Sequence, residues 1–200
     1  MLLIGITGGI ASGKTEVCKV FQKMGAIVLS GDEIGKDVVE KNPLLLKKLT
    51  KTFGEEILDS KKRLKRKKLG ELAFSSFALT KKLNQIIHPY LLQNLKLKIK
   101  NLKRKNYKGP VIIDAALLVE WGLEKKLDYL IFVDSSKKDR VKRLVQKKGY
   151  TKKQAEKRIK AQLPEFEKRK HADFIIKNNK GLRELRKKAN SFWRKITEMI

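Results

Sequence analysis

The stretch GGIASGKT (residues 8–15) determines how the rest of the chain is interpreted. Its glycines and its final Lys-Thr pair fit the G-x-x-x-x-G-K-[ST] pattern of a phosphate-binding loop. Glycine lets the backbone turn tightly and point its N–H groups inward, and a following helix directs its positive end to the same place. In this pattern the lysine reaches the terminal phosphates of a nucleotide and the threonine hydroxyl binds Mg²⁺.

The residues on either side supply the context that this motif requires. Residues 2–6 form a short apolar run typical of a buried strand, and apolar residues then recur at helical spacing over residues 17–24. A strand, a loop and a helix in this order predict nucleotide phosphate binding. A glycine-rich turn that happens to precede a helix is the weaker alternative.

Further apolar runs predict the fold class. They occupy residues 2–6, 26–29, 111–113, 130–133 and 174–176. The runs do not alternate with polar residues, which favours strands covered on both faces and therefore a parallel sheet. Long helical segments separate the runs, and residues 182–196 carry one apolar stripe typical of a helix packed on the sheet. We expect a five-stranded parallel α/β fold of three layers.

Two segments are too long or too polar to be simple crossovers. Residues 43–108 predict a helical insertion with helices near 43–52 and 66–77 and a long helix after Pro89. Residues 149–170 are basic with few apolar anchors, which is typical of a mobile lid. The core of this single domain is then expected at about 1–42, 109–148 and 171–200.

Size and cysteine content limit the class of protein. The chain has 200 residues and one cysteine, Cys18, which fits a reducing compartment and a small packing role. No apolar run is long enough for a membrane span, and the N-terminal run is interpreted as a core strand instead of a signal peptide. We therefore expect a cytoplasmic protein, monomeric or weakly self-associating.

The formal net charge of +28 raises the possibility of nucleic-acid binding. The surplus of Lys and Arg lies in segments 61–108 and 137–200, which have helical patterns, and aromatic residues do not interleave it as on a base-stacking surface. Solvated helix faces are the favoured interpretation. Attraction of an anionic substrate comes second, and dedicated nucleic-acid binding is the least favoured.

Carboxylates at the ends of the predicted strands are the first candidates for chemistry, because ligands of open parallel sheets bind off the carboxyl ends of the strands. Asp32 follows the second run, and it is equally interpreted as a general base for phosphoryl transfer or as the N-cap of the next helix. Asp114 ends the third run as a Walker B aspartate does, and a role in the water shell of Mg²⁺ fits it. Asp134, after the fourth run, suits a turn or cap.

Arginines are candidates for stabilising the transferred phosphoryl group, because the planar guanidinium binds two oxygens at once. Arg140 and Arg143 follow the fourth run, and Arg158 lies in the predicted lid, although in so basic a chain any one arginine is more often a solvated surface group. His88 precedes Pro89 at an expected helix break and is more typical of a structural residue. The sequence has neither a metal-ligand cluster nor a Ser/His/Asp hydrolase pattern.

These elements together resemble the dephospho-coenzyme A kinase family over nearly the whole chain. The resemblance is carried by an ordered set of segments: ITGGIASGKT (6–15), IVLSGDEIGKDVV (27–39), RLKR (63–66), LNQIIHPYL (83–91), DAALLVE (114–120), AEKRIKAQ (155–162) and IIKNN (175–179). It implies a P-loop kinase core with a substrate domain and a lid. It also implies Mg²⁺-dependent transfer of a phosphoryl group from ATP to the ribose 3′-hydroxyl of dephospho-coenzyme A.

The resemblance also implies site residues. The residues with implied catalytic roles are Asp32, Lys14, Arg143 and Arg158. Those implied in ATP binding are Gly8, Gly9, Ala11, Ser12, Gly13, Lys14, Thr15, Glu16 and Arg143, and Mg²⁺ is expected on Thr15 and, through water, on Asp114. Those implied in substrate binding are Asp32, Lys36, Arg66, His88 and Asp114. Three positions depart from the family pattern. Ser30-Gly31-Asp32 replaces Asp-Ala-Asp, Lys36 replaces an arginine, and Ala116 replaces a proline.

Other P-loop proteins remain alternatives at this stage. A nucleoside monophosphate kinase shares every argument drawn from the loop. A GTPase is disfavoured because the Asn-Lys-x-Asp guanine element is missing, Asn179-Lys180 being followed by Gly181-Leu182. A nucleic-acid-binding protein with a relic loop is the third alternative.

Overall fold

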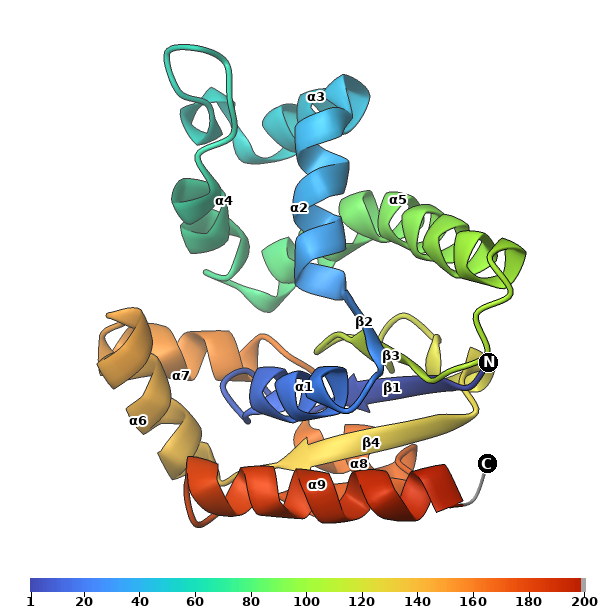
Figure 1. The fold of residues 1–200 in the computed structure, drawn as a ribbon. Coiled ribbons are helices and arrows are strands. Elements are labelled where there is room, and N and C mark those ends of the chain that lie inside the picture. The colour runs from blue at the N-terminus through green and yellow to red at the C-terminus, as the bar shows by residue number, and fades with distance from the viewer. Residues whose placement is uncertain (199–200) are drawn as a thin grey trace.

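The sheet has five strands, and all of them are parallel (Figure 1). The computed structural model describes residues 1–198, with every side chain except that of Lys148. The strands are β1 (Leu3–Thr7), β2 (Ile27–Ser30), β3 (Val111–Asp114), β4 (Tyr129–Asp134) and β5 (Phe174–Lys177), in the order β2-β3-β1-β4-β5. This confirms the fold class that the unbroken apolar runs predict.

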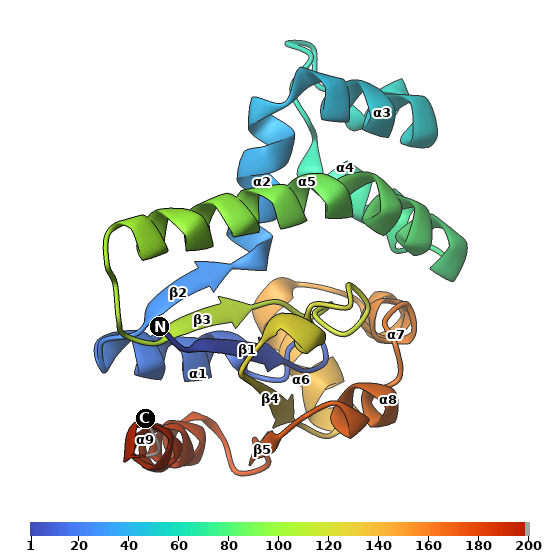
Figure 2. The ribbon, with the colours of Figure 1, turned by 90° about the vertical axis from the view of Figure 1, so that its right-hand side faces the viewer.

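Helices connect and cover these strands. They are α1 (Lys14–Lys23), α2 (Gly31–Lys41), α3 (Pro43–Phe53), α4 (Arg66–Ala73), α5 (Phe77–Arg104), α6 (Lys137–Lys148), α7 (Lys152–Lys160), α8 (Glu165–Lys170) and α9 (Leu182–Glu198), with short 3₁₀ turns at Glu55–Ile57 and Glu124–Lys126. Figure 2 shows α5 on one side of the sheet and α1 and α9 on the other. None of the helices within residues 1–198 combines the length and apolarity needed to cross a bilayer.

Alternate residues of the strands pack into two separate hydrophobic cores, one on each face of the sheet. On one face Ile4, Ile6 and Ile131 pack with α1 and α9, where the rings of Phe21 and Trp193 lie 4.9 Å apart. On the other face the sheet packs with α2, α3, α4 and α5 through a second apolar cluster. Burial on both faces is the reason why the strand sequences do not alternate.

The helical region above the sheet begins at α2, whose buried side chains join the same cluster as α3 and α5 (Figure 1). The expectation that the long helix starts after Pro89 is wrong, because α5 starts at Phe77 and contains Pro89. Proline removes one backbone donor from a helix, and the packing of Leu83, Leu91 and Leu95 in the core offsets this loss. His88 consequently lies inside a helix and not at a break.

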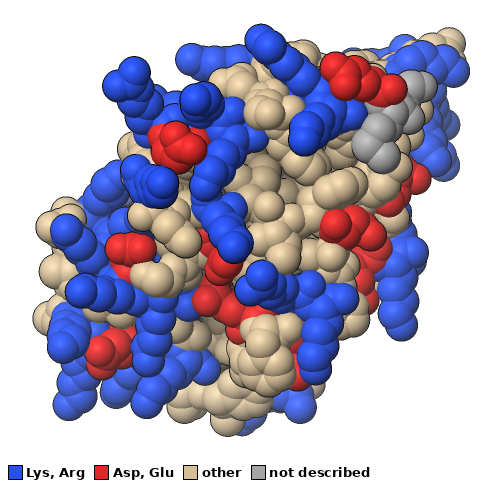
Figure 3. Space-filling view, turned by 90° about the horizontal axis from the view of Figure 1, so that it is seen from below, with Lys and Arg blue, Asp and Glu red and all other residues tan. Residues whose placement is uncertain are grey.

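The basic side chains on the lower face of the molecule are interspersed with acidic ones. Figure 3, the view from below, shows Lys and Arg spread over the face with Asp and Glu among them. Many of these side chains belong to exposed helix positions, as in α9. This distribution is that of solvated helix faces.

Candidate functional site

The loop between β1 and α1 has the backbone geometry of an anion cradle. Gly8 and Gly13 adopt φ values of 142° and 110°, and Ala11 adopts 61°. Positive φ values are readily adopted by glycine, which explains why glycine occupies the first two positions. Helix α1 begins at Lys14 without a side-chain cap. The N–H groups at its first two residues, Lys14 and Thr15, precede the first intrahelical hydrogen bond, which the Glu16 N–H donates to Gly13, and they are available to phosphate oxygens.

Lys14 folds back over the loop. Its Nζ donates hydrogen bonds to the carbonyl oxygens of Gly8 and Gly9, at 3.0 and 3.1 Å. Burial lowers the pKa of Lys14, and the nearby carboxylates of Asp114 and Asp32 act in the opposite direction. The structure thus brings the loop lysine and both predicted carboxylates into one electrostatic cluster.

Asp32 is not a helix cap. The N-cap of α2 is Ser30, whose Oγ accepts a hydrogen bond from the N–H of Glu33 at 3.2 Å. Asp32 lies in the first turn of the helix with an exposed side chain. The alternative that made Asp32 the cap is therefore wrong, and its carboxylate is free to meet a substrate. Serine and aspartate are both favoured caps, so Ser30 fits a position where the family has aspartate.

Asp114 ends β3 between the two strands that carry the loop and Asp32. In the sheet register it pairs with Ile6 of β1 and with Ser30 of β2. Burial raises the pKa of Asp114, and the Lys14 ammonium opposes this shift. Behind it, burial together with the Asp114 charge raises the pKa of the Cys18 thiol. Cys18 is a protonated packing residue, as its position suggested.

Arg143 supports the loop from behind. Its guanidinium donates to the carbonyl oxygens of Ala11 (3.0 Å) and Ser12 (3.4 Å), to Oγ of Ser135 (2.8 Å) and to the carbonyl oxygen of Asn178 (3.2 Å). These acceptors belong to the loop and to the ends of β4 and β5. In this conformation Arg143 holds the loop in position by bonds to the protein itself.

Arg158 of α7 packs against two aromatic rings. Its guanidinium carbon is 4.7 Å from the ring centre of Phe74 and 4.5 Å from that of Tyr150, which is cation–π geometry. Phe74 follows α4, so the arginine joins the predicted lid to the helical region. In this arrangement its contacts are with aromatic rings and not with the loop.

The predicted substrate residues of the helical region lie on three helices, α2, α4 and α5. Arg66 pairs with Glu40 at 2.5 Å and also donates to the carbonyl oxygen of Lys36 at 3.3 Å. Lys36 is itself exposed on α2. His88 stacks on Trp121 at 5.6 Å, and burial lowers its pKa, which favours the neutral ring. The Arg66 contacts join α4 to α2, and the His88–Trp121 contact joins α5 to the segment after β3.

A protein-only metal site is not found within residues 1–198, where no group of three His, Cys, Asp or Glu side chains lies close enough to hold an ion. Mg²⁺ in phosphoryl-transfer sites keeps several waters and is held largely by the phosphates of the substrate. One exposed hydroxyl, on Thr15, and one strand-end carboxylate, on Asp114, fit that mode of binding.

Sequence comparison decides the family. The sequence model of the dephospho-CoA kinase family matches residues 2–184. The chain belongs to the dephospho-CoA kinase family. Dephospho-CoA kinases from Fusobacterium nucleatum and Corynebacterium glutamicum are 38% and 34% identical to it, over 96% and 100% of this chain and 97% and 100% of theirs.

Solved structures agree with membership of the dephospho-CoA kinase family. A dephospho-CoA kinase from Campylobacter jejuni superposes with a TM-score of 0.62 at 26% identity, covering 97% of this chain and 96% of that one. A Thermus thermophilus protein superposes with a TM-score of 0.79 at 30% identity, covering 100% of this chain and 98% of that one. Shikimate kinase from Acinetobacter baumannii shares the fold, with a TM-score of 0.53 at 14% identity. The match covers 99% of this chain and 94% of that one.

Asn178 is a loop-positioning residue that sequence reasoning did not single out within IIKNN. Its buried side chain donates from Nδ2 to the carbonyl oxygen of Ser12 at 2.6 Å. A Cβ atom on Gly13 would lie 2.5 Å from this Nδ2 atom, so glycine is needed for the close approach. The contact joins residues 166 positions apart, and no local sequence pattern predicts it.

Replacement of Asn178 by alanine is expected to loosen the loop of this kinase. The Ser12 carbonyl loses its shorter, buried hydrogen bond and keeps only the 3.4 Å bond from Arg143, which costs about 2 kcal/mol of unfolding free energy. Denaturant unfolding measures the loss, and the KM for the nucleotide should rise as well. Asn179→Ala, at an exposed neighbouring position, is the control and should leave both quantities unchanged. An Asn178→Ala protein as stable as the control would contradict this role.

Segment α7–α8, predicted as a weakly anchored lid, is anchored at its α8 end. Lys168 of α8 is fully buried, and its Nζ lies 2.6 Å from the carbonyl oxygen of Ala116 and 2.7 Å from Oε1 of Glu120. Burial lowers the pKa of Lys168, and Glu120 opposes that shift. Ala116 stands where the family has proline, and the lysine bond holds this turn.

Two further contacts tie the same segment to the loop. Oε1 of Gln162 accepts the N–H of Ile10 at 2.9 Å. Arg140, buried on α6, pairs with Glu165 at 2.6 Å, and this pair lies where a Cβ atom of Gly9 would be. The expectation that residues 149–170 bury little is therefore wrong for 161–170, because buried polar contacts replace the apolar anchors that the sequence lacks.

Lys168→Met is expected to be strongly destabilising. It leaves Glu120 in a largely buried position without its cation, at a cost of about 3 kcal/mol in the free energy of unfolding. The double variant Lys168→Met/Glu120→Gln should lose less, because no unpaired charge remains. Thermal and denaturant unfolding of both proteins, with exposed Lys170→Met as the control, checks the expectation. Equal losses in the single and double variants would contradict it.

Proposed function

We propose that this chain transfers the γ-phosphoryl group of ATP to the ribose 3′-hydroxyl of dephospho-coenzyme A, forming coenzyme A and ADP in the last step of coenzyme A synthesis. The observation that carries the proposal is the electrostatic cluster of Lys14, Asp32 and Asp114 at the carboxyl ends of β1, β2 and β3, in a member of this family. It contains a phosphate-binding cation after β1 and two carboxylates, at the ends of the neighbouring strands β3 and β2.

The loop and Lys14 bind the donor nucleotide. N–H groups at the head of α1 surround the phosphates of ATP, and Lys14 exchanges the Gly8 and Gly9 carbonyls for phosphate oxygens. Mg²⁺, held by Thr15 and, through water, by Asp114, would supply neutralisation of charge on the phosphates. Arg143 keeps the loop in shape from below, and Glu16 lies in the first turn of α1.

Asp32 is the general base. The hydroxyl of the acceptor donates to this carboxylate, loses its proton to it and attacks the γ-phosphorus as ADP leaves. The exposed position of Asp32 in the first turn of α2 leaves its oxygens open to the cleft. In-line transfer of this kind depends chiefly on positioning and charge stabilisation.

The helical region binds the acceptor. Lys36, Arg66 and His88 line up from α2, α4 and α5, and the two cations suit the diphosphate of dephospho-coenzyme A. Arg158 leaves the rings of Phe74 and Tyr150 and reaches the transferred phosphoryl group when α7 closes. The same proposal divides the chain into a core, an insertion at 43–108 and a lid at 149–170. It also places the protein in the cytoplasm, as a monomer or a weakly associated oligomer.

A panel of acceptors tests the substrate. Purified protein is incubated with ATP and Mg²⁺ and either dephospho-coenzyme A or a nucleoside monophosphate, and kcat/KM is measured for each acceptor. We expect dephospho-coenzyme A to be preferred by at least about 10³-fold, since a site built to bind polar groups discriminates strongly against acceptors that lack them. A nucleoside monophosphate as the better acceptor would reject the proposal.

A further inference from the structure

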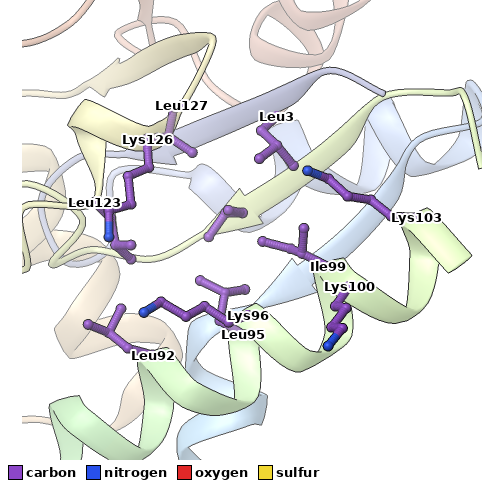
Figure 4. A pocket seen from close by; sticks show the side chains of 11 residues that line it. Leu3, Leu92, Leu95, Lys96, Ile99, Lys100, Lys103, Leu123, Lys126 and Leu127 are labelled. Carbon is purple, nitrogen blue, oxygen red and sulfur yellow. The ribbon is translucent and has the colours of Figure 1, made fainter.

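A cavity of about 320 Å³ lies between the second half of α5 and the sheet (Figure 4). Its walls come from β1, β3, the 3₁₀ turn before β4 and α5. The apolar lining consists of Leu3, Leu92, Leu95, Ile99, Ile113, Leu123 and Leu127. The volume falls at the lower end of the range of small-molecule sites, about 300–1,000 Å³.

This cavity is separate from the phosphate site. Leu3 is the first residue of β1, whereas the phosphate-binding loop follows Thr7 at the other end of the strand. At roughly 3.3 Å per residue the two ends of the strand lie about 13 Å apart. None of the residues assigned to nucleotide or acceptor binding lines the cavity.

Lysines form the polar rim. Lys96, Lys100 and Lys103 follow one another at helical spacing on α5, and Lys126 comes from the opposite wall. Figure 4 shows Lys96 and Lys103 extending from α5 towards the strand side. Ion pairs found among the described residues involve none of these four ammonium groups.

The nearest acidic residues in sequence do not line the cavity. Glu124 and Asp128 flank the wall that carries Lys126, and Asp128 accepts the N–H of Leu3 at 2.7 Å. The rim therefore combines like charges without a carboxylate among the lining residues. An anion at this rim would relieve the repulsion between the lysines, and an alkyl chain would fill the apolar floor.

We propose that the cavity binds a single-chain amphiphile with an anionic head group, of the class of medium-chain fatty acids. Its alkyl chain lies on Leu95, Ile99 and Ile113, and its carboxylate meets Lys96 and Lys103. The small volume favours one free chain over a bilayer surface. The site is independent of phosphoryl transfer and stands even if the acceptor assigned above is wrong.

Titration calorimetry with decanoate tests the site, with ATP and Mg²⁺ in excess so that the phosphate loop is occupied. We expect saturable binding to the wild-type protein below the concentration at which decanoate forms micelles. Decanol, which has the same chain and no charge, should bind at least about tenfold more weakly, since each lost charge-assisted contact removes affinity. No saturable decanoate binding, or equal binding of decanol, would overturn the proposal.

Variants separate the cavity from the general basic surface. Lys96→Glu/Lys103→Glu should weaken decanoate binding at least tenfold, and the control Lys82→Glu/Lys98→Glu, at exposed α5 positions outside the cavity, should not. Ile99→Trp, which fills the cavity, should abolish binding while phosphoryl transfer and melting temperature stay near the wild-type values. Unchanged decanoate binding in either cavity variant would overturn the proposal.

Discussion

Lys14→Ala should lower kcat by about 10³-fold while the protein stays folded. The ammonium group lies over the loop, where it donates hydrogen bonds to the carbonyls of Gly8 and Gly9. Its role in the proposed reaction is to neutralise charge that grows on the transferred phosphoryl group. Steady-state kinetics with saturating ATP and dephospho-coenzyme A measures the effect.

Stability distinguishes this loss from unfolding. Burial lowers the pKa of Lys14, so the buried charge is unfavourable for the folded state, and its removal should leave the melting temperature unchanged or raise it. Lys19→Ala is the matched control, since Lys19 is an exposed lysine of the same helix. A Lys14→Ala enzyme with kcat within a few-fold of the Lys19→Ala enzyme would contradict the assignment.

Asp32→Asn should reduce kcat by a similar factor, about 10³ or more. Asparagine keeps the shape of the side chain and cannot take the proton of the acceptor hydroxyl. Because Ser30 caps α2, the substitution leaves the helix start intact, and the free energy of unfolding should not change. Single-turnover transfer from labelled ATP, with both substrates saturating, measures the chemical step.

Two control variants test whether the loss of kcat comes from the missing base. Glu33→Gln, at the adjacent exposed position, should keep kcat near normal. Ser30→Ala removes the cap and should cost about 1 kcal/mol of stability. A near-normal kcat in Asp32→Asn would show that Asp32 is not the base.

The sequence was sufficient for the elements whose signals are local. The unbroken apolar runs predicted the parallel sheet, because burial on both faces makes every residue of a strand apolar. The motif at residues 8–15 predicted a strand, a loop and a helix in that order, and the structure contains them. The role of Asp32 was harder to predict, since aspartate is also a common helix cap and only the bond from Glu33 identifies Ser30 as the cap.

Other features depend on contacts between distant segments. Pro89 suggested a helix end, and the packing of α5 on both sides of it overrode that preference. Lys168 lies in a lysine-rich segment and resembles a solvated residue, yet it is fully buried against Glu120, 48 positions earlier in the sequence. A single sequence gives no signal for a partner at that separation.

The most direct test of the account is a crystal structure with a non-hydrolysable ATP analogue, Mg²⁺ and dephospho-coenzyme A bound together. The account predicts the analogue's phosphates within the 8–15 loop, and the ribose 3′-oxygen within hydrogen-bond reach of an Asp32 oxygen, about 2.6–3.2 Å. The same oxygen should lie about 3–3.5 Å from the γ-phosphorus. A 3′-oxygen beyond reach of Asp32, or phosphates bound away from the loop, would contradict it.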